Sequence, residues 1–138
     1  MPRTATARRT APVTPAPEDR LSGTAIEIFA RIAALWKLSI GEQRTLLGGV
    51  PESTYFKYLK HPQSARLSPD MLERISHVLG IFKSINVLLP RHEAADAWIR
   101  RSNDASLFKG RSALEYVLSG RFEDLVAVRR YLDAMRGW

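Results

Sequence analysis

The sequence predicts an all-α protein of several short helices joined by tight turns. Apolar residues from Leu21 onward recur at steps of three and four, which places them on one helical face. Helix-starting and helix-stopping residues bracket most of these segments, and no segment shows the alternation of a strand. A chain of 138 residues has room for one compact domain or two very small ones that share a core.

The first twenty residues are expected to form a disordered, basic and Pro-rich arm. They contain four prolines and one large aliphatic residue, Val13, so they cannot bury enough apolar surface to offset the entropy of ordering. A basic presequence would have a similar composition, and that alternative stays open. The arm lacks the apolar core of a secretory signal, no run is long enough to span a membrane, and the chain has no cysteine. We therefore expect a protein of the reducing cytoplasm.

The first predicted helix covers residues 22–38, where one face carries Ile26, Phe29, Ala33 and Trp36. The second covers 40–47 and starts from a capping box, in which the side chains of Ser39 and Glu42 each bond the other's backbone N–H. The glycine pair 48–49 ends it, because glycine tolerates a left-handed turn.

The third predicted helix covers residues 51–60, with Pro51 in its first turn and Pro62 beyond its end. The fourth and longest covers 69–89 and follows a Ser68 cap. Gly80 lies inside this helix, where it lowers helix propensity and either permits close packing or marks a bend. Three further helices are predicted at 93–101, at 112–119 behind a second capping box of Ser112 and Glu115, and at 122–135.

The net charge of +7 and the sequence pI of 10.2 favour a polyanionic partner, with nucleic acid preferred to a lipid surface. The excess lies in the first half of the chain. Residues 44–66 carry four basic residues against one acidic residue, whereas 112–138 carry four of each.

Residues 40–60 have the layout of a helix-turn-helix unit, whose second helix lies in the major groove of DNA. We expect Phe56 and Leu59 to pack inward. The candidate base contacts are Ser53, Thr54, Lys57 and Tyr58, and the candidate phosphate contacts are Arg44 and Lys60. The alternative, two surface helices with a solvated basic face, stays open.

Nothing in the sequence predicts catalysis, a cofactor or a metal site. The histidines at 61, 77 and 92 have no metal-ligand spacing, and nucleotide-binding glycine loops and nucleophile motifs are absent. The C-terminus instead carries Arg129, Arg130 and Arg136 before Gly137-Trp138. Such an end is suited to insert into a partner's cleft as a cationic and aromatic plug. The alternative that Trp138 lies on its own last helix stays open.

The chain resembles the Xre/MbcA/ParS-type antitoxins over residues 22–138. The resemblance rests on the order and spacing of several weak motifs: Trp36-Lys37-Leu38-Ser39, Leu46-Leu47-Gly48, Ser53-Thr54-Tyr55, Leu67-Ser68-Pro69-Asp70, Leu88-Leu89-Pro90, Ala95-Asp96-Ala97-Trp98, Arg111-Ser112-Ala113-Leu114 and Val128-Arg129-Arg130-Tyr131. Where the family often has Pro-Asn, this chain has Ser102-Asn103.

The resemblance implies an Xre-like helix-turn-helix domain at 21–83 and a toxin-binding domain at 84–138. It implies a cognate RES-domain toxin with an ADP-ribosyltransferase-like fold, which degrades NAD or uses it to modify a protein. In this family the C-terminal region covers the toxin's active site and the pair represses its own operon, as a homodimer or a larger hetero-oligomer with toxin. Arg129, Arg130, Arg136, Gly137 and Trp138 would occlude that site. A stand-alone regulator whose C-terminal half only dimerises is the alternative.

Overall fold

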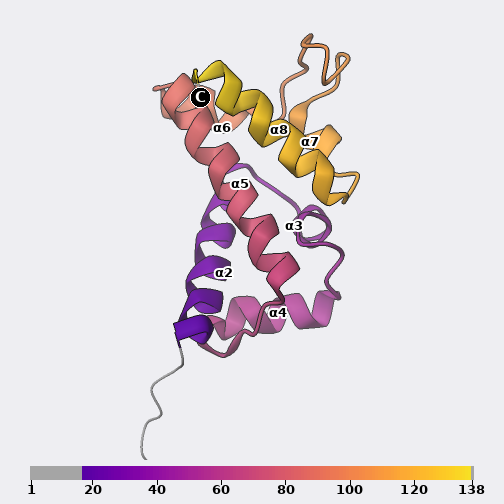
Figure 1. Cartoon of the computed structure of the whole chain (residues 1–138). Helices are drawn as coiled ribbons and strands as arrows, with labels where there is room; N and C mark the ends of the chain where they lie inside the picture. Colours follow the sequence, from indigo (N-terminus) through magenta and orange to yellow (C-terminus); the bar gives the residue numbers. More distant parts are fainter. Residues whose placement is uncertain (1–16, 138) are drawn as a thin grey trace, which may run out of the picture.

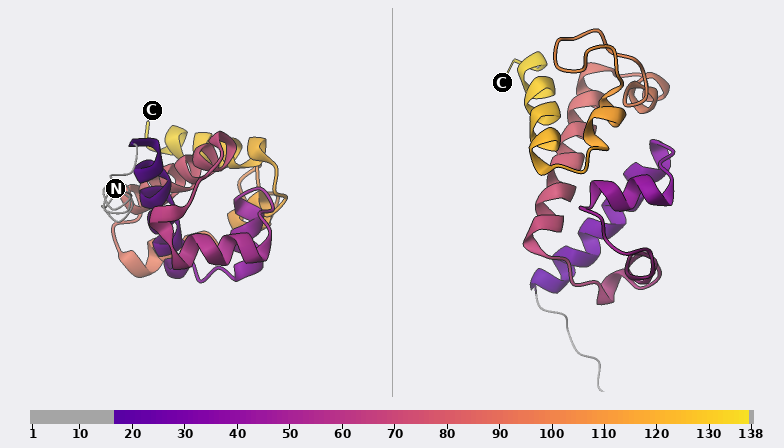
Figure 2. Two further views of the ribbon diagram at one scale, coloured as in Figure 1. Left: turned by 90° about the horizontal axis from the view of Figure 1, so that it is seen from below. Right: turned by 90° about the vertical axis from the view of Figure 1, so that its right-hand side faces the viewer.

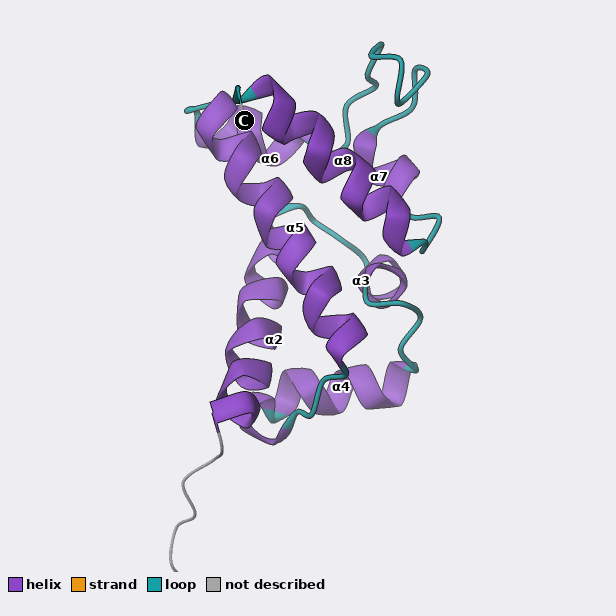
Figure 3. Ribbon diagram, viewed as in Figure 1, coloured by secondary structure: helices purple, strands orange, loops and turns teal. Residues whose placement is uncertain are grey.

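The structure, a computed structural model, describes residues 17–137 and omits the side chains of residues 17–19. This part of the chain contains seven α-helices and no strand (Figures 1 and 3), so the predicted all-α fold is confirmed. In chain order the elements are α2 (Pro17–Leu35), α3 (Ile40–Leu46), α4 (Glu52–Lys60), the short 3-10 turn η1 (Pro62–Ser64), α5 (Pro69–Leu88), α6 (His92–Trp98), α7 (Ala113–Val117) and α8 (Phe122–Met135).

Helix α2 begins and ends earlier than the sequence suggested. It starts at Pro17, so the last four residues of the expected arm are helical, and the rest of the arm lies outside the described residues. A first-turn proline favours this start, because its fixed φ suits the first turn of a helix. At the other end Lys37 adopts a left-handed conformation with φ of 56°. The chain reverses there, and the Leu38 N–H donates to the Ala33 carbonyl at 2.9 Å.

The predicted helix starts are confirmed where a side-chain cap was expected. The Ser39 hydroxyl accepts from the Glu42 N–H at 3.1 Å, and a Glu42 carboxylate oxygen accepts from the Ser39 N–H at 2.8 Å. Ser112 and Glu115 form the same reciprocal pair, and Ser68 caps α5. Caps of this kind each contribute about 1 kcal/mol.

Helix α5 runs the length of the molecule and joins its two halves (Figure 1). It packs against α2 in the first half and against α8 in the second half. It continues without a break through residues 83–84, where one domain was expected to give way to the next.

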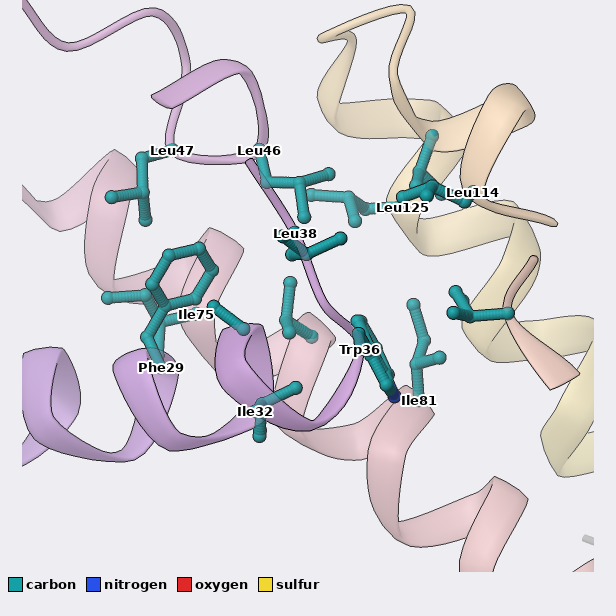
Figure 4. Packing of buried hydrophobic residues seen from close by; sticks show 14 of the residues in the cluster. Phe29, Ile32, Trp36, Leu38, Leu46, Leu47, Ile75, Ile81, Leu114 and Leu125 are labelled. Atoms are coloured by element: carbon teal, nitrogen blue, oxygen red, sulfur yellow. The ribbon is translucent and has the colours of Figure 1, made fainter. Parts of the chain in front are cut away.

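The two halves share one core of buried apolar side chains. Figure 4 shows Leu38 and Leu46 of the first half extending toward Leu114 and Leu125 of the second half. Each of these four leucines is less than one-tenth exposed. Burying such a side chain contributes about 1.5–3 kcal/mol, so the packing couples the stability of the two halves.

Candidate functional site

The turn between α3 and α4 is built as the sequence predicted. Gly48 and Gly49 both have left-handed φ values, 94° and 89°, and carry the chain from one helix to the next. Arg44 holds the far side of this turn: its Nε donates to the Val50 carbonyl at 2.8 Å, and its Nη1 lies 3.7 Å from the Glu52 carboxylate. Arg44, a predicted phosphate contact, therefore also fixes the start of α4.

A buried polar pair sets how α4 lies against α3. The Tyr55 hydroxyl donates to Gln43 Oε1 at 2.5 Å, and Gln43 Nε2 donates to the Leu38 carbonyl at 3.0 Å. The Tyr55 ring also meets Phe29 edge to face, with centroids 6.5 Å apart. Burial raises the pKa of Tyr55 well above its ordinary value, so the hydroxyl keeps its proton and remains a donor.

The expectation that Phe56 packs inward is wrong. Tyr55 takes the buried position, and because successive helical residues are turned by about 100°, Phe56 is rotated out and is 45% exposed. Leu59 is half-buried. The face of α4 that points away from the core is formed by five exposed residues: Glu52, Ser53, Phe56, Lys57 and Lys60.

Three of the predicted DNA contacts therefore lie on one exposed face: Ser53, Lys57 and Lys60. Thr54 and Tyr58 are half-buried, and helical spacing places them at the edge of that face. Helix α4 lies at one end of the molecule and the last turn of α8 lies toward the other (Figures 1 and 2).

Two of the three arginines predicted to act as a plug turn back toward α5, Arg129 toward its middle and Arg136 toward its C-terminal part. Arg129 Nη1 donates to the Ser76 carbonyl at 3.3 Å and lies 3.3 Å from His77 Nδ1. Arg136 Nη1 donates to the Ser84 hydroxyl at 3.1 Å, and that hydroxyl donates to Asp133 at 3.2 Å. Ser84 is fully buried, so this network ties the end of α8 to α5.

Arg130, by contrast, is exposed. Gly137 is exposed as well and has a left-handed φ of 86°, which turns the chain at the end of α8. Trp138 lies outside the described residues.

His77 lies where α8 contacts the middle of α5. Its ring meets Phe122 edge to face, with centroids 5.2 Å apart. Burial lowers the pKa of His77, and the positive charges of Arg129 and Arg130 lower it further, while the Glu73 carboxylate opposes the shift. The neutral imidazole can therefore accept a hydrogen bond from the Arg129 guanidinium.

An apolar surface near the end of α8 was missed by the sequence reasoning. A pocket of about 180 Å³ opens there, with a mostly apolar lining that includes Leu88, Trp98 and Met135. Met135 is 56% exposed and Val87 is 59% exposed. The run Val87-Leu88-Leu89 at the end of the predicted helix was a usable signal, because three successive apolar residues there cannot all face one core.

Among the side chains that the structure describes, no group of three His, Cys, Asp or Glu residues could hold a metal ion. Within residues 17–137, no helix is long and apolar enough to cross a membrane.

Comparison with known proteins matches both halves of the chain. Residues 15–80 match the antitoxin Xre-like helix-turn-helix domain, and residues 86–137 match the antitoxin Xre/MbcA/ParS C-terminal toxin-binding domain. The chain is also 47% identical over 112 residues to uncharacterized protein y4oB of Sinorhizobium fredii (strain NBRC 101917 / NGR234), a match that covers 81% of this chain and 84% of that protein. The α3–α4 unit lies in the first matched domain, and the C-terminal part of α8 lies in the second. The chain therefore belongs to the Xre antitoxin family, with a helix-turn-helix domain followed by a toxin-binding domain.

Proposed function

We propose that this antitoxin neutralises a RES-domain toxin by covering its NAD-binding cleft with the end of α8 and the residues that follow. The observation that carries the proposal is the surface at the end of the matched toxin-binding domain, where exposed Arg130 and Met135 lie on the last turns of α8. Arginine is enriched among the residues that dominate the energy of protein interfaces, and an exposed apolar side chain adds apolar surface that a partner can bury. The proposed complex forms in the cytoplasm as a larger hetero-oligomer with toxin.

The contacts of the three arginines suggest a division of roles. Arg130, being exposed, would meet acceptor groups of the toxin that otherwise contact the dinucleotide. Arg129 and Arg136 would position α8 through Ser76 and Ser84. Gly137 and Trp138 would extend the contact into the cleft.

Co-expression with the product of the neighbouring gene tests this half of the proposal, which expects that product to be a RES-type toxin. Arg130→Ala, and a chain truncated after Ala134, should lose protection, measured as growth and cellular NAD. Arg31→Ala, at an exposed position of α2, should protect like the wild type. Equal protection by the truncated and full-length chains, both shown to be folded by thermal melting, would remove the C-terminal end from the mechanism. If the chain does not copurify with the neighbouring gene's product, and that product alone causes no loss of NAD, the RES assignment is overturned. A stand-alone regulator is then favoured.

We propose further that α4 binds the operator of its own operon, with the chain acting as a dimer on two half-sites. The exposed basic face of α4 supports this, as does its place at the end of the molecule away from the last turn of α8. Log affinity falls as log salt rises, and each phosphate contact should add about 0.9 to the magnitude of that slope. Lys57→Ala and Lys60→Ala should each reduce that slope, whereas Lys83→Ala, at an exposed position of α5, should not. An unchanged slope for both α4 variants would contradict the proposal.

A further inference from the structure

Phe56 is a large apolar side chain in the middle of a polar surface. It is 45% exposed, and the other exposed residues of α4 are Glu52, Ser53, Lys57 and Lys60. The register of the helix prevents it from turning inward, because Tyr55 is fully buried and bonded to Gln43. The exposure of Phe56 is therefore imposed by the packing of α3 against α4.

The charges around Phe56 favour a polyanionic partner over an apolar protein surface. Ser53 precedes it by three residues and Lys60 follows it by four, so both lie on the same stripe of the helix. Lys57 is exposed beside them. Glu52, the acidic residue of this helix, lies 3.7 Å from Arg44, and this pairing reduces its repulsion of phosphate. Burying two lysines against an apolar partner would be costly, whereas phosphate groups flanking the major groove can pair with them.

The major groove contains one apolar group that a phenyl ring can recognise. Thymine presents a C5 methyl there, and the other three bases present hydrogen-bond donors and acceptors without it. A phenyl ring cannot satisfy those polar groups, but it can exclude water from a methyl group. The proposed DNA-binding role places the exposed face of α4 against these base edges.

We propose that Phe56 makes α4 selective for thymine by packing on its C5 methyl. This inference rests on the proposed binding of DNA by α4 and adds the base that the helix reads. Lys57 and Lys60 supply affinity for any sequence, and Phe56 supplies preference at one position of each half-site.

The test uses the full chain and duplexes selected from a random pool for tight binding. Each thymine of the selected duplex is then replaced by deoxyuridine, which removes only the methyl group. At one thymine per half-site the wild type should lose about fourfold in affinity, the effect of exposing roughly one buried CH₂-sized group. The Phe56→Ala chain should bind the two duplexes equally, and Phe56→Leu should keep part of the preference. Lys57→Ala should weaken binding to both duplexes by the same factor.

The outcomes separate the two proposals. Thymine reading is overturned if the wild type binds DNA but loses no affinity at any deoxyuridine. It is also overturned if Phe56→Ala loses as much affinity at deoxyuridine as the wild type does. Both outcomes leave the DNA-binding proposal intact. Failure of the wild type to bind any duplex overturns both. Because Phe56 is exposed, its substitution should leave the melting temperature nearly unchanged, which the same preparations can verify.

Discussion

The guanidinium of Arg129 occupies the space that a side chain at position 80 would need. A Cβ on Gly80 would lie 2.5 Å from both Cζ and Nε of Arg129. The sequence left open whether this glycine permits close packing or marks a bend. Because α5 continues through residue 80 and the Arg129 guanidinium lies directly over it, Gly80 permits close packing of α8 against α5 and does not mark a bend.

Gly80→Ala should therefore show a stability effect that depends on Arg129. Alanine raises helix propensity by about 1 kcal/mol, but in the wild type it displaces the guanidinium from the Ser76 carbonyl and His77. We expect little gain or a net loss in the wild type, and a gain of about 1 kcal/mol in an Arg129→Ala background. Chemical denaturation of the four proteins measures the coupling.

Gly41→Ala in α3 is the matched control, because a Cβ there meets nothing closer than 3.9 Å. It should stabilise the chain by the same amount in both backgrounds. Additive effects of Gly80→Ala and Arg129→Ala would mean that the guanidinium does not hold this position in solution.

The lowered pKa of His77 predicts that the folded chain becomes less stable as the pH falls. Burial and the charge of Arg129 lower that pKa below the ordinary value of 6.5, so on acidification the unfolded chain takes up the proton first. The neutral ring's contribution is then complete above about pH 6.5 and is lost as the pH falls from there through the folded-state pKa.

Melting temperatures of the wild type and His77→Gln between about pH 8 and pH 5 test this, since histidine titrates in that interval. The advantage of the wild type should shrink at the acidic end. His92→Gln, at an exposed position of α6, controls for histidine loss in general. Parallel curves for wild type and His77→Gln would show that this imidazole does not couple folding to protons.

Local signals in the sequence predicted local structure well. Both capping boxes depend on residues three positions apart and the two-glycine turn on adjacent residues, and each forms as predicted. The prediction that Phe56 packs inward was wrong, because the contact that holds Tyr55 in the core comes from Gln43, twelve residues away.

The inward direction of Arg129 and Arg136 could not be read from α8 itself. Charged residues there look like a solvated face, and their partners lie about fifty residues earlier. The usable signal was on α5, where Gly80 and Ser84 are small residues one turn apart on the same face of the helix. Small side chains at that spacing leave room for a neighbouring helix and its long side chains.

Tyr55→Phe should destabilise the first half of the chain. It removes the donor to Gln43 Oε1 in a buried site, and an unsatisfied buried acceptor costs about 1–3 kcal/mol. Thermal unfolding would show the loss. Tyr58→Phe, at a half-buried position of the same helix, should cost less. Equal stability of wild type and Tyr55→Phe would show that Gln43 finds another partner.

Ser84→Ala should loosen the end of α8 while leaving α4 unchanged. The buried hydroxyl of Ser84 accepts from Arg136 and donates to Asp133, so its removal breaks both bonds between α5 and the last turns of α8. We expect a loss of about 1 kcal/mol in global stability and faster amide exchange over residues 129–136.

Ser76→Ala, at an exposed position of α5, should leave exchange at its wild-type rate, because Arg129 uses the backbone carbonyl of that residue. Unchanged exchange over 129–136 in Ser84→Ala would contradict a positioning role for this network. Exchange in α4 serves as the internal reference, since it lies toward the other end of the molecule and should stay the same in every variant.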